Sequence, residues 1–97
     1  MNWLDQQDPT RRDAIGTVLD SERGARYLNY AGGDRGFAAW LLVADTLCLR
    51  QVGVSLFDLS DWAWRDAYDT GEAPGAALRE ALRADDTYAA RFPPRPA

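Results

Sequence analysis

Apolar residues between Gly36 and Val52 recur with the spacing that places them on one face of an α-helix. The stripe consists of Phe37, Trp40, Leu41, Ala44, Leu47, Cys48 and Val52. Leu42, Val43 and Leu49 fall off this stripe and are apolar too, so most of the helix circumference is apolar. Such a helix is normally buried on several sides, and 17 residues that include an Asp are short and polar for a membrane span. We therefore predict a core helix over 36–52.

Shorter helices are predicted before the core helix. The first begins at Asp8, because an Asp side chain accepts backbone N–H bonds and the Pro that follows suits the first helical position. It is expected to end near Glu22, with Gly24 as the stop. The segment 25–31 has the aromatic content of a strand, but we favour a helical turn because no pairing strand is evident elsewhere. Asp34 can then cap the core helix.

Further helical segments are predicted after the core helix, which should end at Gly53. They are a turn over 56–59, a helix over 61–69 and a last helix from 74 to about 85. Ser55 can cap the turn, Ser60 or Asp61 can cap the next helix, and Gly71 should end it. Apolar spacing assigns to the core Trp64, Ala67, Tyr68, Ala77, Leu78, Ala81 and Leu82.

The expected fold class is all-α: a small single-domain bundle of four to five short helices around a central apolar helix. We divide the chain into a loose N-terminal arm over 1–8, a single helical domain over 9–92 and a disordered Pro-rich tail over 93–97. A chain of 97 residues with 46% hydrophobic residues can form a modest core without disulfides.

The composition removes several kinds of chemistry. There is no His and no Lys, so the chain lacks the commonest general base, the commonest transition-metal ligand and the Schiff-base residue. The single Cys48 suits a buried thiol in a reduced compartment. The N-terminus has no basic start followed by an apolar run, so we expect no secretory signal and a cytoplasmic location. We expect no enzyme activity, no cofactor and no metal.

The acidity of the chain is concentrated in one segment. The net charge is −4, and residues 58–72 account for all of it with five acids and Arg65 as the one base. The acids are Asp58, Asp61, Asp66, Asp69 and Glu72. Because phosphate backbones require clustered positive charge, we expect no direct binding to nucleic acid, and we expect no membrane association either.

The acidic segment has three explanations that need no partner. A calcium loop needs acidic or amide ligands at alternate positions followed by Gly and a late Glu, and the spacing around Gly71 does not fit. Paired carboxylates for acid–base catalysis would need a substrate cleft that the segment does not indicate. The acids could instead be helix caps and solvated surface, with Arg65 paired to Asp61 or Asp69 at helical spacing.

The functional alternative is an acidic patch with an aromatic residue at its centre. If Trp64 and Tyr68 point into the core, a helix over 61–69 turns Trp62 about 200° away from Trp64 and towards solvent. An exposed Trp among carboxylates suits a basic protein surface, because Trp anchors interfaces and complementary charge speeds encounter. The predicted partner-binding residues are Asp58, Asp61, Trp62, Arg65, Asp66, Asp69 and Glu72.

The second half of the chain also resembles a known sequence pattern. Gly53-Val54-Ser55, Asp58-Leu59, Asp61, Arg65-Asp66-Ala67-Tyr68-Asp69, Gly71, Pro74, Ala77 and Leu82 carry the resemblance. They resemble a short module of bacterial and bacteriophage proteins that has no assigned activity. The resemblance covers about residues 40–82 and departs from the pattern at Ser60, where the module usually has Pro. It implies a helical fold and a phage or mobile-element setting, and no catalytic residue.

The expected function is that of a non-enzymatic interaction module whose acidic segment around Trp62 contacts a basic protein. In its concrete form, the chain is a phage or mobile-element inhibitor or adaptor that mimics the charge of a nucleic acid. The alternative is a homo-oligomeric structural or accessory protein, since a core helix this apolar and four Trp residues could mean that one face is buried between copies.

Overall fold

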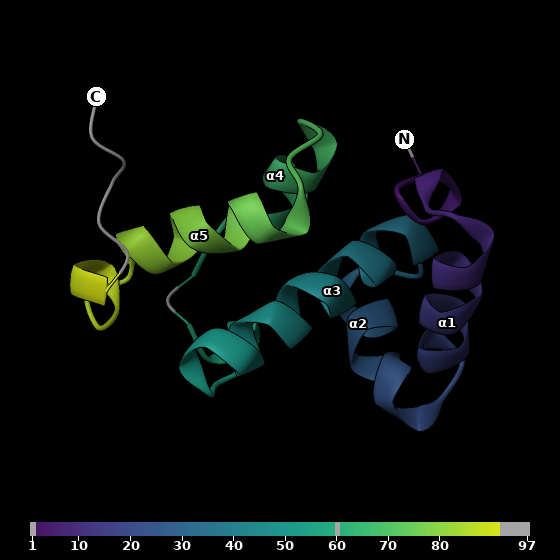
Figure 1. The fold of residues 1–97 in the computed structure, drawn as a ribbon, viewed down its shortest axis with the longest axis horizontal. Helices are drawn as coiled ribbons and strands as arrows, with labels where there is room; N and C mark the ends of the chain where they lie inside the picture. Colours follow the sequence, from purple (N-terminus) through teal and green to yellow (C-terminus); the bar gives the residue numbers. More distant parts are fainter. Residues whose placement is uncertain (1, 60, 92–97) are drawn as a thin grey trace. The chain divides into compact units, whose positions relative to one another are not determined.

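The computed structural model describes residues 2–59 and 61–91. In these residues the chain is all-α, with five α-helices, four short 3-10 helices and no strand, so the predicted fold class is confirmed. The α-helices are α1 (Pro9–Leu19), α2 (Ala25–Tyr30), α3 (Arg35–Val52), α4 (Trp64–Asp69) and α5 (Pro74–Ala84) (Figure 1). The 3-10 helices are η1 (Leu4–Gln6), η2 (Glu22–Gly24), η3 (Leu56–Asp58) and η4 (Ala89–Arg91). The cap predicted at Ser60, the last residue of the predicted domain 9–92 and the predicted tail 93–97 lie outside the described residues.

The chain separates into two units with their boundary inside α3. The first unit covers Met1–Val43 and the second Ala44–Ala97. The single domain predicted over 9–92 stays a prediction, and each unit is described by itself below.

In the first unit, α1 and α2 lie side by side and both contact η2 (Figure 1). The start of α1 is as predicted, because Asp8 Oδ1 accepts the backbone N–H of Arg11 at 3.1 Å. The end of α1 differs from the prediction, because the helix stops at Leu19 and not near Glu22. Gly24 does not act as a left-handed stop, because its φ is −74°. It lies so close to the backbone of Leu19 that a Cβ would overlap it, so this glycine is required by packing.

The segment expected to be a loose arm contains η1, and Leu4 within it is buried. The backbone carbonyl of Trp3 accepts a hydrogen bond from Gln7 Nε2 at 3.0 Å. The guanidinium of Arg11 lies 5.6 Å from the centroid of the Trp3 ring, a cation–π distance. These contacts hold the described part of the arm to the start of α1.

The core helix has the predicted position, and Asp34 Oδ1 caps it by accepting the N–H of Phe37 at 3.2 Å. Residues 36–42 are all buried, which fits a helix covered on several sides. Further along the same helix, Leu47 and Val52 are only half-buried and Leu49 is 43% exposed. Burial around the whole circumference is therefore limited to the N-terminal part of α3.

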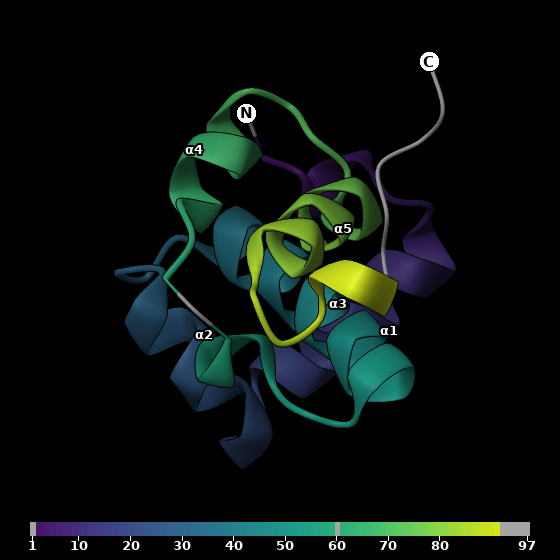
Figure 2. The same cartoon turned by 90° about the vertical axis from the view of Figure 1, so that its left-hand side faces the viewer.

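In the second unit, α4 contacts α5, and η4 lies beside the C-terminal end of α5 (Figures 1 and 2). Gly53 and Gly71 end α3 and α4 as predicted, with φ of 76° and 85°, values that favour glycine. Ser55 caps η3 by accepting the N–H of Phe57 at 3.3 Å. The buried apolar side chains in the described residues of this unit are Ala44, Cys48, Leu56, Trp64, Ala67, Tyr68, Pro74, Ala77, Leu78, Ala81 and Leu82.

Candidate partner-binding surface

The residues predicted to bind a partner lie between the end of η3 and the turn that follows α4. We call them the acidic surface: Asp58, Asp61, Trp62, Arg65, Asp66, Asp69 and Glu72. Six of the seven are exposed and Trp62 is half-buried. All five carboxylates of this stretch therefore face solvent, and each can be reached by another molecule.

Helix α4 fixes its part of the acidic surface through its opposite face. Trp64 and Tyr68 are 4% and 1% exposed, and Ala67 between them is buried as well, as the spacing predicts. Arg65, Asp66 and Asp69 occupy the remaining positions of the helix and are exposed. Two buried aromatic rings thus hold the exposed charges in place.

Trp62 was predicted to lie within a helix over 61–69, and this placement is wrong. Helix α4 begins at Trp64 and its N-cap residue is Ala63, so the cap predicted at Asp61 is wrong. Ala63 has φ −81° and ψ 67°, and the N–H of Trp64 donates to the carbonyl of Trp62 at 2.9 Å. These are the features of an inverse γ-turn. Trp62 therefore precedes the helix, its position is set by this turn, and the residue is half-buried.

Arg65 forms the ion pair that its spacing indicated. Its Nε donates to both carboxylate oxygens of Asp69, each at 3.2 Å. Its guanidinium also lies 5.7 Å from the centroid of the Tyr68 ring. Both partners of the pair are about half exposed, so the pair contributes little to stability. It does neutralise one carboxylate of the acidic surface.

Three carboxylates of the acidic surface, those of Asp58, Asp61 and Asp66, keep their charge available. Within residues 2–59 and 61–91, Asp58, Asp61 and Asp66 form no ion pair. The arginines of the first unit include Arg35, which pairs with Asp20 of the same unit at 2.7 Å. The carboxylates of Asp58, Asp61 and Asp66 are thus exposed and take part in none of the ion pairs of the described residues.

Asp45 is a buried carboxylate of the same unit that was not predicted from the sequence. Asp45 is 1% exposed, and its Oδ1 accepts the Ser55 hydroxyl at 2.8 Å and the N–H of Leu56 at 2.9 Å. These bonds join α3 to the first residues of η3, the turn that ends at Asp58. An Asp inside an otherwise apolar helix was the available signal, because a buried acid requires polar partners.

Cys48 lies one turn after Asp45 and is completely buried. Burial, together with the negative charges of Asp45 and Asp58, raises the pKa of its thiol from 9.0 to about 11. The thiol therefore stays protonated at neutral pH, which makes it a poor nucleophile and a poor metal ligand. This agrees with the expected buried structural thiol.

Two further observations concern the whole described chain. Across residues 2–59 and 61–91, no three His, Cys, Asp or Glu side chains cluster in a way that could hold a metal ion. None of the helices in these ranges combines the length and the apolar character that crossing a membrane demands.

Comparison with known proteins adds no assignment, since no protein-family model, curated protein or solved structure matches this chain.

Proposed function

We propose that this chain is a non-enzymatic, cytoplasmic interaction module whose acidic surface binds a basic surface of another protein. The observation that carries the proposal is the exposed, unneutralised charge of Asp58, Asp61 and Asp66, held at the end of η3 and around the start of α4. A basic surface that normally binds nucleic acid is the matching partner, because it presents clustered Arg and Lys to receive phosphates.

The physical basis is charge complementarity with an aromatic contact. Carboxylates on a fixed helix steer a basic partner into encounter and select against acidic ones. Trp62 is half-buried and directly follows Asp61 in the sequence, and aromatic residues contribute strongly to interface affinity. The chain would act by occupying the partner's nucleic-acid site, as an inhibitor or adaptor. The resemblance of residues 40–82 to a bacterial and bacteriophage module supports a phage or mobile-element setting.

Affinity capture from the native host tests the proposal. The wild-type chain and a variant with Asp61→Asn, Asp66→Asn and Asp69→Asn are immobilised, and captured proteins are eluted with rising salt. Loss of three charges weakens a screened electrostatic contact, so the variant should lose the basic partner or release it at lower salt. The result against the proposal is capture of the same partners with the same salt dependence.

A matched control variant tells whether binding depends on where the negative charges lie or only on the total charge of the chain. Asp5, Asp13 and Glu22 are exposed carboxylates of the first unit. Changing them to Asn, Asn and Gln removes the same net charge outside the acidic surface. This control should capture and release the partner as the wild type does, and equal loss in both variants would mean that only the total charge matters.

The homo-oligomer remains the alternative, and the structure gives it less support. The large apolar side chains exposed in residues 2–59 and 61–91 are Tyr30 and Leu49, one in each unit. Scattered apolar residues of this kind are normal on a monomer surface. Light scattering at several concentrations distinguishes the two, because a stable dimer or larger assembly would favour the alternative.

A further inference from the structure

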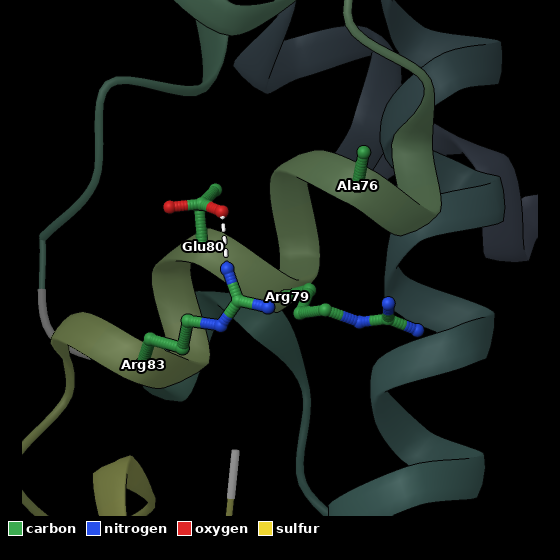
Figure 3. Close-up of a pocket in the computed structure, with 4 residues that line it drawn as sticks. All are labelled: Ala76, Arg79, Glu80 and Arg83. Atoms are coloured by element: carbon green, nitrogen blue, oxygen red, sulfur yellow. Dashed lines mark hydrogen bonds and ion pairs between the residues drawn. The ribbon is translucent and has the colours of Figure 1, made fainter. Parts of the chain in front are cut away.

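Helix α5 carries a hollow of about 330 Å³ on its outer face. Its lining residues are Ala76, Arg79, Glu80 and Arg83 (Figure 3). They recur at helical spacing on the side away from the buried Leu78 and Leu82. The volume lies near the lower end of the range for small-molecule sites, about 300–1,000 Å³, so only a small ligand would fit.

Arg83 is unusually well covered for a residue on an exposed helix face. Its side chain is 20% exposed, and its Nη1 donates to Glu80 Oε1 at 2.6 Å. Its Nε is fully buried and has no hydrogen-bond acceptor within the described chain. A buried N–H donor without an acceptor is unfavourable. A movement of this guanidinium that offers Nε to an oxygen atom in the hollow would remove that penalty.

Arg79 supplies a second guanidinium one turn earlier on the same face. It is exposed, and in residues 2–59 and 61–91 it forms no ion pair. Figure 3 shows the guanidinium of Arg83 turned towards Glu80 and that of Arg79 turned the other way. Two arginines against one glutamate leave the hollow with one net positive charge.

We propose that this hollow binds a small oxyanion, the carboxylate or phosphate group of a small molecule, between Arg79 and Arg83. The planar guanidinium donates two parallel N–H bonds to either group. The carboxylate of Glu80 lowers the positive charge of the hollow, which disfavours highly charged anions. A bound anion would also compete with Glu80 for the guanidinium of Arg83. The proposal is independent of the acidic surface.

The test is an NMR titration of the full chain with inorganic phosphate and, separately, with acetate, at constant ionic strength. Saturable shifts centred on α5 with either anion support the proposal, and the anion that binds more tightly identifies the ligand group. Arg79→Gln should weaken binding about tenfold or more, the effect of losing a charge-assisted hydrogen bond. Arg79 is exposed, so this variant should fold normally.

Two further variants complete the test. Arg23→Gln removes an exposed arginine of the first unit and should leave binding unchanged. Glu80→Gln removes the competing carboxylate and should tighten binding. Absence of saturation with both anions overturns the proposal, as does equal affinity of the wild type and Arg79→Gln, or unchanged or weaker binding by Glu80→Gln.

Discussion

Removing the buried carboxylate of Asp45 should destabilise the chain far more than removing an exposed one. Asp45 Oδ1 accepts hydrogen bonds from the Ser55 hydroxyl and the Leu56 N–H, at 2.8 and 2.9 Å, in a fully buried setting. The informative change is Asp45→Ala. Its matched control is Asp20→Ala, which also deletes a paired carboxylate, but one whose side chain is 66% exposed beside Arg35.

The magnitude follows from the two bonds. A hydrogen bond to a charged group contributes about 1.5–3 kcal/mol, and a buried donor left without an acceptor costs a similar amount. Asp45→Ala removes both bonds and leaves the Leu56 N–H buried, so we expect a loss of about 3–5 kcal/mol. A chain of this size has a total free energy of unfolding of about 5–15 kcal/mol. Asp20→Ala breaks only an exposed ion pair and should cost about 0–1 kcal/mol.

The free energy of unfolding of the wild type and of both variants is measured by urea denaturation, with tryptophan fluorescence and circular dichroism as the two signals. The free energies are compared at a constant m-value. Ser55→Ala should lie between them at about 1–3 kcal/mol, because it removes one bond to Asp45 and the cap of η3. In a double-mutant cycle, Asp45 and Ser55 should be coupled, since they share a bond. Equal losses for Asp45→Ala and Asp20→Ala would refute the reasoning.

Three other predictions follow, for which the same unfolding assay measures the changes in stability and the capture assay measures the change in affinity. The pKa of the Cys48 thiol is raised to about 11 in the folded chain, so the unfolded chain loses this proton at lower pH. The free energy of unfolding should therefore fall as the pH rises from about 9 to 11. In Cys48→Ala this decrease should be smaller by about 2–3 kcal/mol. Gly24→Ala should cost about 1–3 kcal/mol because its Cβ would overlap Leu19. Gly16→Ala should stabilise by about 0.5–1 kcal/mol, because this helical position leaves room for a Cβ at ordinary contact distance, 3.8 Å, from Arg35 Nη2. Arg65→Gln should change stability by less than about 1 kcal/mol but should raise affinity for a basic partner, and lower affinity would contradict the role given to this surface.

The helical fold could be predicted because its determinants are local in the sequence. Helix starts at Asp8 and Asp34 and stops at Gly53 and Gly71 follow from cap chemistry and backbone conformation. The inward face of α4 follows from 3.6-residue periodicity. None of these features depends on what the segment later contacts.

The features that the sequence did not reveal depend on particular contacts. Asp45 finds its partner Ser55 ten residues along the chain, and no spacing rule links an acid in a helix to a later turn. Gly24 is required by the approach of the Leu19 backbone, which the sequence does not encode locally. The γ-turn at Ala63 shortens α4 and repositions Trp62. The exposed carboxylates of the acidic surface were predicted because acids without nearby bases tend to face solvent.

Carbodiimide cross-linking of the captured complex tests the central claim most directly. The reagent joins carboxylates to amines, and this chain has no Lys. Cross-links to the partner must therefore run from its carboxylates to the partner's amines, or from its own amino terminus. Peptide mass spectrometry should find the partner's lysines joined to Asp61, Asp66 or Asp69. Cross-links confined to carboxylates of the first unit would contradict binding through the acidic surface.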